Sequence, residues 1–422
     1  MEQKIYNEYV EILKEELLPA MGCTEPIAVA YAAAVAVQAL GEKPESVEVN
    51  VSANIIKNVK SVVVPCTGGL RGIGAAVCAG IVAGCPEKEL EILEEITGEQ
   101  KVEMKKMLDT MPMTIRESDK EYIFDIQIKA CAGGHSEYVE NAGFHTNVIC
   151  VKKDDEIIRE KAYEEQGSSC ATDRSLLTVE KIIEFADCVD VADVEEVLQR
   201  QIDYNWAIAE EGMTGNWGAA IGKTLMEAYG NSVHNRAKAM AAAGSDARMN
   251  GCELPVVINS GSGNQGMTTS LPVIVYAKEL NVSKEMMLRA LVVSNLITIH
   301  MKTGIGRLSA YCGAISAGCG AGAGICYLYG GRAYEISHVI VNAVAINSGV
   351  VCDGAKASCA AKIASAVEAG LLGLQMQKNG KQFYGGDGLV EKGVENTIRN
   401  IGELAKKGMR ETDKTIIQIM TR

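Results

Sequence analysis

The sequence predicts an α+β protein in which a large, mostly α-helical domain carries a smaller α/β domain, inserted after the N-terminal helices. The chain has 422 residues, which is enough for two domains and a large core. Alternating hydrophobic residues occur in its first half, whereas apolar residues at helical spacing dominate after residue 178. Its 43 glycines outnumber four Phe and two Trp, which favours closely packed helices. We assign residues 1–45 and 190–422 to the helical domain and 46–189 to the α/β domain.

Two helices are expected at the N-terminus. Residues 3–19 place apolar side chains at helical spacing, at Ile5, Tyr9, Ile12, Leu13 and Leu17. Thr24 is the expected N-cap of a second helix, with Pro26 in its first turn and an Ala/Val-rich run to about Leu40. Cys23 would then lie just before a helix N-terminus, where the positive end of the helix dipole favours a thiolate.

A mixed α/β pattern follows. Residues 46–52 alternate as a half-buried strand, and residues 62–64 are a second candidate strand. The remaining expected elements are helices at 71–83 and 87–108, strands at 122–130 and 145–151, and a charged, exposed stretch at 152–165.

The second half predicts helices almost throughout. They are expected at 178–187, 193–228, 232–245, 267–279, 283–300, 314–328, 332–347 and 357–371. No long Pro- or Ser-rich linker separates the two parts, so we expect them to pack against each other.

Composition excludes several classes of function. The net charge of -13 argues against a nucleic-acid partner, because phosphate binding needs a basic surface. The longest apolar stretch, residues 27–40, is shorter than the roughly 18 to 20 residues that span a bilayer. No signal-peptide pattern opens the chain, so we expect a cytoplasmic protein without a membrane partner. Its fourteen cysteines should be reduced, which favours thiol, metal or redox roles over disulfides.

Three cysteines stand out because each lies in a polar turn beside glycine or a helix start: Cys23, Cys312 and Cys352. Together they suggest one folded site. The chain contains no C-x-x-C motif, so cysteine spacing alone identifies neither a zinc site nor an iron-sulfur cluster.

Neighbouring cysteines recur at intervals of seven residues, after Cys312 and after Cys352. Seven helical residues rise about 10 Å, so at most one cysteine of each helix should join a small cluster. We expect Cys319, Cys326 and Cys359 to be buried thiols.

The segment from Gly261 to Gly266 matches G-x-G-x-x-G, but the βαβ unit and the acidic residue that a dinucleotide site requires are missing. The same backbone geometry predicts an anion cradle for a substrate carboxylate. Its side chains would be Ser260, Ser262, Asn264 and Gln265. A plain Gly-rich loop is the alternative.

Charged side chains near these cysteines are candidates for proton transfer or anion binding. His300 could serve as a base, or could interact with the end of its own helix. Lys302, Arg307 and Lys356 could hold a carboxylate or stabilise thiolates, with solvated surface charge as the alternative.

Four motifs occur in the same order as in a known family: Met21-Gly-Cys-Thr-Glu-Pro-Ile-Ala, Ser260-Gly-Ser-Gly-Asn-Gln-Gly, Gly306-Arg-Leu-Ser-Ala-Tyr-Cys-Gly-Ala and Cys352-Asp-Gly-Ala-Lys. Nearly the whole chain resembles the L-cysteine desulfidase family, which is related to the α chain of iron-sulfur L-serine dehydratases. The resemblance implies that Cys23, Cys312 and Cys352 are three ligands of a [4Fe-4S] cluster with one open iron, bound by the helical domain. The N-terminal cysteine motif departs from the dehydratase pattern and favours the desulfidase branch.

By this resemblance the chain would be a carbon-sulfur lyase that converts L-cysteine to pyruvate, ammonia and sulfide without PLP. The open iron would take the substrate sulfur, and a base would remove the Cα proton. We rank Lys302 and His300 ahead of Lys356 as that base, and assign the carboxylate to the 260–265 loop with Arg307 and Lys356.

A small amino acid is thus the expected partner, and the sequence leaves a homodimer possible. Three other functions remain open. An L-serine ammonia-lyase would use the same cluster with a hydroxyl leaving group. A non-catalytic iron-sulfur or sulfur-transfer protein would make no pyruvate, and a cofactor-free binding module would not need the three cysteines.

Overall fold

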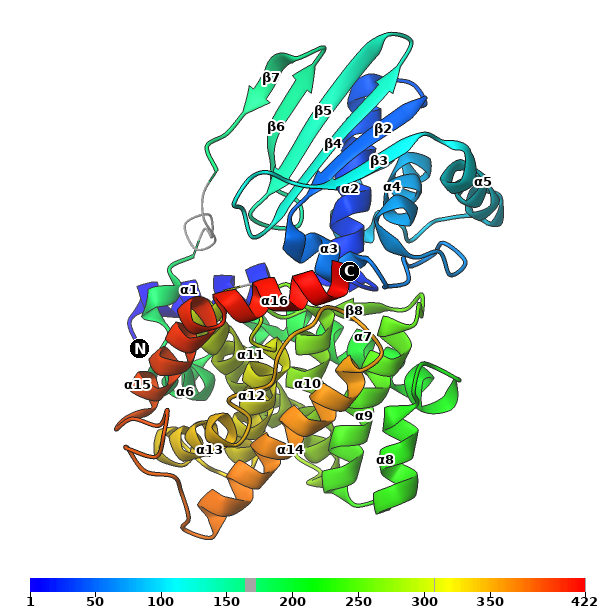
Figure 1. The fold of residues 1–422 in the computed structure, drawn as a ribbon. Helices are drawn as coiled ribbons and strands as arrows, with labels where there is room; N and C mark the ends of the chain where they lie inside the picture. The colour runs from blue at the N-terminus through cyan, green and yellow to red at the C-terminus, as the bar shows by residue number, and fades with distance from the viewer. Residues whose placement is uncertain (164–171, 307, 422) are drawn as a thin grey trace.

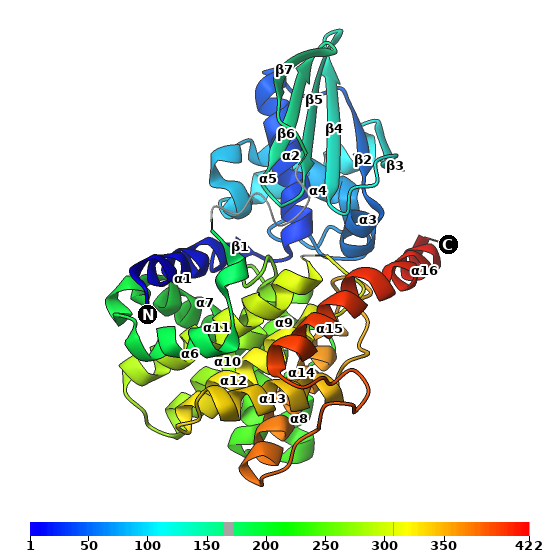
Figure 2. The ribbon, with the colours of Figure 1, turned by 90° about the vertical axis from the view of Figure 1, so that its left-hand side faces the viewer.

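The α+β class is confirmed by the computed structural model, which describes residues 1–163, 172–306 and 308–421. A six-stranded sheet with helices on it forms one body, stacked on the helices of the second half (Figures 1 and 2). The predicted boundaries at residues 45 and 189 stay a prediction.

The sheet has the strand order β3-β2-β4-β5-β6-β7; β2 and β3 are parallel and the other neighbours antiparallel. Its strands are β2 (Ser46–Val51), β3 (Met113–Glu117), β4 (Asp125–Ala132), β5 (His135–Ala142), β6 (Val148–Lys153) and β7 (Glu156–Glu160). The helices of this body are α3 (Ala53–Val59), α4 (Gly72–Ala83), the 3₁₀ helix η1 (Pro86–Glu91) and α5 (Gly98–Thr110).

Three of these strands were missed by the sequence analysis. Strands β3 and β7 are the sheet edges and expose most of their side chains, so they lack the alternation that marks a half-buried strand. Strand β5 buries polar side chains, among them Glu137, Glu140 and Asn141. The candidate strand at 62–64 forms only an isolated bridge from Val63 to Arg71. The helix expected at 87–108 is divided into η1 and α5.

The N-terminal helices are α1 (Gln3–Glu16) and α2 (Thr24–Leu40). Helix α1 contacts α11 in the helical body, and its Tyr9 hydroxyl donates to the Leu176 carbonyl at 2.8 Å. Helix α2 packs on β4, β5 and α4, so it covers the sheet. Its N-cap is Cys23, one residue before the expected Thr24.

The helical body comprises α6 (Val179–Cys188), α7 (Glu195–Thr214), α8 (Ile221–Tyr229), α9 (Val233–Met249), α10 (Gly263–Glu279), α11 (Lys284–Ile305), α12 (Gly313–Leu328), α13 (Ala333–Ile346), α14 (Cys359–Lys378), α15 (Val394–Glu403) and α16 (Arg410–Thr421). Shorter pieces are the 3₁₀ helices η2 (Arg174–Leu176) and η3 (Val191–Asp193) and the π-helix η4 (Leu404–Gly408). The helix expected at 193–228 is two helices, because Gly218 (φ 53°) and Ala220 (φ 50°) adopt left-handed backbone between α7 and α8.

Small residues let α12 and α14 cross closely, as the glycine content predicts. A Cβ atom on Gly318 of α12 would lie 2.3 Å from the Ala366 carbonyl oxygen of α14, far inside van der Waals contact. Gly370 is restricted in the same way by the Gly318 carbonyl. The two helix starts are therefore held at a fixed separation by glycine packing in their middles.

None of the helices in the described ranges combines the length and the apolar character needed to cross a bilayer.

Candidate functional site

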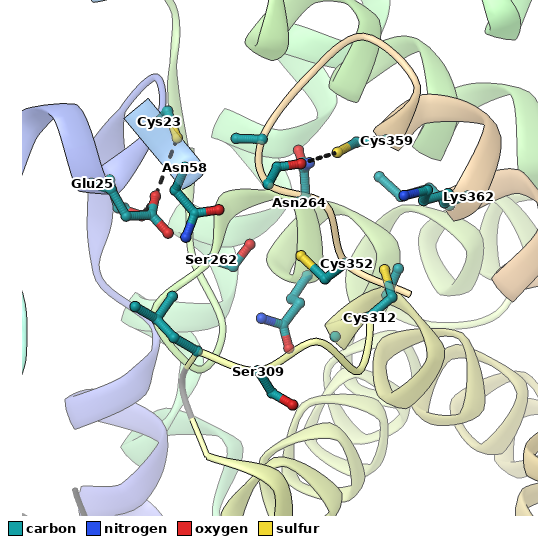
Figure 3. A pocket seen from close by; sticks show the side chains of 18 of the residues that line it. Cys23, Glu25, Asn58, Ser262, Asn264, Ser309, Cys312, Cys352, Cys359 and Lys362 are labelled. Carbon is teal, nitrogen blue, oxygen red and sulfur yellow. Dashed lines mark hydrogen bonds between the residues drawn. The ribbon is translucent and has the colours of Figure 1, made fainter. Parts of the chain in front are cut away.

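A pocket between the sheet body and the helical body contains the three cysteines that the sequence singled out (Figure 3). Lys57 and Asn58 of α3 form one side, and the loops and helix starts of the helical body form the other. Four cysteines line it: Cys23, Cys312, Cys352 and Cys359. The cavity encloses about 750 Å³, part of it open solvent.

A short antiparallel strand pair brings the N-terminal cysteine to the Gly-rich loop. Strand β1 (Pro19–Met21) pairs with β8 (Pro255–Val257), so the two chain segments leave the pair side by side. The Thr24 hydroxyl then donates to the Gly261 carbonyl at 3.1 Å. Cys23 is thereby fixed next to a loop more than two hundred residues away in the sequence.

A second backbone pairing joins Cys312 and Cys352. Tyr311 and Val351 form an antiparallel bridge. The Cys312 N–H donates to the Val350 carbonyl at 3.1 Å, and the Cys352 N–H donates to the Ala310 carbonyl at 2.6 Å. These bonds hold the two cysteine loops in register.

Four helices begin at the pocket. Cys23, Ser262 and Cys312 are the N-caps of α2, α10 and α12, and Cys359 is the first residue of α14. None of the three N-cap side chains makes a capping hydrogen bond to the backbone of its helix, and all three line the pocket. Unpaired N–H groups and the positive ends of the dipoles make such a place favourable for thiolates and other anions.

Burial opposes ionisation of these thiols. It raises the pKa of Cys312 to about 12, and the neighbouring Cys352 adds to that rise. Burial also raises the pKa of Cys359, again with a contribution from Cys352. Burial raises the pKa of Cys23 well above its usual value, Glu25 raises it further and Arg248 opposes the rise. A cationic centre among the thiols would release their protons, as metal binding to cysteine does.

Cys23 differs from the other three in its contacts. Its thiol donates to Glu25 Oε2 at 3.2 Å, and the Thr24 hydroxyl donates to the same oxygen at 3.1 Å. Cys359 Sγ lies 3.6 Å from the Gly354 carbonyl oxygen. Among the residues that the structure describes, no three His, Cys, Asp or Glu side chains are close enough together to hold a single metal ion. The labelled cysteines lie at separate points around the pocket (Figure 3).

The expectation that Cys359 is an ordinary buried thiol was wrong. It assumed that Cys352 and Cys359 lie on one helix, but α14 begins only at Cys359. The chain turns between the two residues, so helical rise does not separate them. Cys319 and Cys326 do lie in the core, 1% and 2% exposed, and neither lines the pocket.

The Gly-rich segment contributes Ser262, Asn264 and Gln265 to the pocket. Ser260 does not line it; its hydroxyl donates to Asn259 Oδ1 at 2.9 Å. Helix α10 begins at Gly263, four residues before the expected start. A Cβ on Gly313 would lie 2.7 Å from Cδ of Gln265, so this glycine makes room for the glutamine at the pocket wall.

Of the four charged residues that the sequence analysis proposed for the site, one is found to line the pocket. Lys302 lines the pocket and is 4% exposed. His300 does not line it; its Nε2 lies 2.7 Å from Glu395. Lys356 is likewise absent from the wall and lies 3.6 Å from Asp353. Arg307 falls outside the described residues.

Sequence reasoning missed several charged residues of the wall. Lys57 pairs with Asp413 of α16 at 2.5 Å, and Lys362 pairs with Asp353 at 2.5 Å. Arg248, near the end of α9, donates from Nη1 to Asn264 Oδ1 at 3.1 Å. All three lie inside or at the end of helices. In the sequence, a basic residue at such a position cannot be distinguished from one on the solvent-exposed face of the helix. The sequence around Arg248 mixes Ala247 with the polar residues Ser245 and Asp246, so it gives no clear signal of burial.

Comparison with known proteins gives consistent matches along the chain. Residues 87–418 match the family described as serine dehydratase alpha chain. A UPF0597 protein from Desulfitobacterium hafniense is 59% identical over 419 residues, covering 99% of this chain and 97% of the relative. UPF0597 proteins from Lachnoclostridium phytofermentans and Finegoldia magna are 50% and 47% identical; they cover 99% and 98% of this chain and 100% and 99% of their own lengths.

Proposed function

This chain belongs to the serine dehydratase α-chain family, and from that premise we propose that it is an L-cysteine desulfidase that uses a [4Fe-4S] cluster. The family indicates a lyase of the iron-sulfur type. The proposal adds the substrate, L-cysteine, and the products pyruvate, ammonia and sulfide. Neither PLP nor its binding lysine is part of it.

The observation that carries the proposal is the meeting of four cysteines in one pocket, three of them at helix starts. Thiolates are the protein ligands that hold iron-sulfur clusters. All cysteines that the structure describes have free thiols, so none of the four is tied up in a disulfide. The donor set therefore fits such a cluster, with Cys23, Cys312 and Cys352 as the proposed ligands and Cys359 as a fourth available thiol.

When bound, a cluster with one iron lacking a protein ligand supplies a Lewis acid for the departing sulfur of the substrate. The chain itself must hold the amino acid and move its Cα proton. Ser262, Asn264 and Gln265 line the pocket at the N-terminus of α10, which supports their proposed role in holding the carboxylate. Lys302, as a neutral amine, would accept the Cα proton. Loss of that proton and of the sulfide gives aminoacrylate, which water converts to pyruvate and ammonia.

L-serine is the second candidate substrate, because the matching family is named for serine dehydratase. It would use the same residues with a hydroxyl leaving group. Steady-state rates with the two amino acids distinguish the cases. Higher kcat/KM for L-cysteine supports the desulfidase, and much higher kcat/KM for L-serine decides for the dehydratase.

The experiment is anaerobic purification followed by iron, sulfide and pyruvate assays. We expect brown protein with about four irons per chain, as the cluster type requires, and equal amounts of sulfide and pyruvate from L-cysteine. Fully active, iron-free protein would reject the cluster mechanism. Iron-loaded protein that forms no pyruvate from either amino acid would indicate a non-catalytic iron-sulfur or sulfur-transfer protein.

A further inference from the structure

Arg248 is a buried guanidinium that lacks an acidic partner among the described residues. It is 3% exposed, and the one side-chain hydrogen bond that it makes within the described ranges joins Nη1 to Asn264 Oδ1 at 3.1 Å. The Nε–H is buried and has no acceptor in the same part of the chain. A buried charge normally has a counter-charge, because desolvation is costly. The free donors of Arg248 therefore indicate that an anion completes this site.

The guanidinium of Arg248 packs against the N-terminus of α10. Gly263, the first residue of α10, has no side chain at this point; a Cβ there would lie 2.4 Å from Nε of Arg248. The guanidinium thus lies directly against the start of α10, whose N-terminal N–H groups also favour negative charge. Two independent sources of positive potential meet at one place in the pocket wall.

A second buried polar group in the wall of the same pocket also lacks a partner among the described residues. Gln265 is 6% exposed, lines the same pocket, and its buried Oε1 accepts no hydrogen bond from the described residues. Asn264, which precedes Gln265 and lines the same pocket, already accepts a hydrogen bond from Arg248. An amide and a guanidinium with unused donors or acceptors form a polar surface that a ligand can satisfy.

We propose that Arg248 binds the carboxylate of the substrate and selects α-amino acids over the corresponding amines. The planar guanidinium presents paired N–H donors that match the two oxygens of a carboxylate. The cysteines of the pocket then face the side chain of the bound amino acid. This role rests on the proposed function for the identity of the amino acid, but not for the recognition of a carboxylate.

Equilibrium binding tests the proposal separately from turnover. Calorimetry on anaerobic, cluster-loaded protein would compare L-alanine and L-2-aminobutyrate, which have no β leaving group and so are not turned over, with ethylamine and propylamine, which lack the carboxylate. We expect the wild type to prefer each amino acid over its amine by roughly 10- to 100-fold, the range of a hydrogen-bonded charge pair. Arg248→Gln should remove that preference, and Arg248→Lys should restore part of it.

Two further variants make the result specific. Asn264→Asp places a carboxylate on the guanidinium without removing it, and should weaken amino-acid binding while the protein stays folded. Arg236→Gln changes another arginine of α9, which pairs with Glu279 at the surface, and should bind as the wild type does. Unchanged preference for amino acids in Arg248→Gln and Asn264→Asp would overturn the proposal. Retained carboxylate preference without pyruvate formation would instead reject only the proposed function.

Discussion

The first turn and the middle of helix α12 contain the same residue type in opposite surroundings. Cys312 is the N-cap, lines the pocket and faces Cys352. Cys319, seven residues later, is 1% exposed in the core. Both have a pKa raised to about 12, chiefly by burial. Thiol ionisation alone therefore does not distinguish them; position at a helix start beside other cysteines does.

Helix α14 repeats the contrast. Its first residue, Cys359, lines the pocket, while Ala366 and Gly370 in its middle pack against Gly318 of α12. The helix middles set the spacing, and the helix starts supply the reactive groups. Variants at the two kinds of position should therefore affect different properties of the protein.

The largest expected effect comes from Cys312→Ala set against Cys319→Ala. Removing a proposed ligand should lower cluster affinity by more than about 100-fold, beyond the usual effect of residues that only support ligands. Cys319→Ala removes a core sulfur and should leave iron content unchanged. Iron per chain after anaerobic reconstitution measures both. Equal iron content in the two variants would remove Cys312 from the proposed ligand set.

The cysteines also show how much of the candidate site can be predicted from the sequence. The three cysteines that the sequence places in polar turns, Cys23, Cys312 and Cys352, all line one pocket, and their role as ligands stays a prediction. Cys359 was misjudged because its position depends on where α14 begins, and a helix start is uncertain by several residues when no strong N-cap marks it. A one-dimensional spacing rule fails wherever the chain turns between two residues.

The fold was predictable to a similar degree. Helices α6, α9, α10, α12 and α13 were expected within four residues of their observed ends, because their apolar periodicity is strong. Helices α11 and α14 extend further than expected, and α15 and α16 were missed. Edge strands and the polar strand β5 were missed, since their side chains reflect tertiary burial instead of alternation. Arg248 could not be identified for the same reason: its burial arises from α10 packing against it, with a glycine at the contact.

Gly318→Ala tests the packing region. Its Cβ would lie 2.3 Å from the Ala366 carbonyl, so α12 and α14 must separate. Overpacking of this kind costs about 1 to 3 kcal/mol in the free energy of unfolding. Urea unfolding followed by circular dichroism measures it. A wild-type midpoint would show that the crossing of α12 and α14 is not rigid.

Gly313→Ala tests the helix start of the same helix. Its Cβ would meet the end of the Gln265 side chain, which can move by rotating, so stability should change little. Displacing that amide should raise KM for the amino acid several-fold and leave kcat nearly unchanged. Steady-state kinetics of reconstituted protein gives the two parameters. A large loss of stability with an unchanged KM would show that the start of α12 serves packing and not substrate binding.

The smallest effect is expected on the outer face of α14. His234, whose Nε2 lies 2.8 Å away, lowers the pKa of Glu368 to about 2, and Lys238 at 2.6 Å adds to this. A lowered carboxyl pKa contributes stability above its ordinary value of 4.5, and this contribution is lost as the pH falls toward 2. The carboxylate is 43% exposed, so Glu368→Gln should cost less than about 1 kcal/mol.

Unfolding curves at several pH values check this last prediction. Wild type and Glu368→Gln should differ most above pH 4.5 and converge as the pH falls to about 2. A difference that persists at low pH would show that packing, not charge, links α9 and α14 here.

The pairing of β1 with β8 and the bridge between Tyr311 and Val351 have a consequence for biosynthesis. The pocket joins residues from both ends of the chain, so its contacts are among those of greatest sequence separation. Such contacts form late, because the loop-closure entropy must be met before they contribute stability. During translation Cys23 is synthesised long before Cys312, Cys352 and Cys359, so the pocket wall can be complete only after the start of α14 has left the ribosome. A cofactor that contacts both the N-terminal and the C-terminal residues of the pocket can bind only after all of them have been synthesised. Its uptake would therefore show that these two parts of the chain have come together.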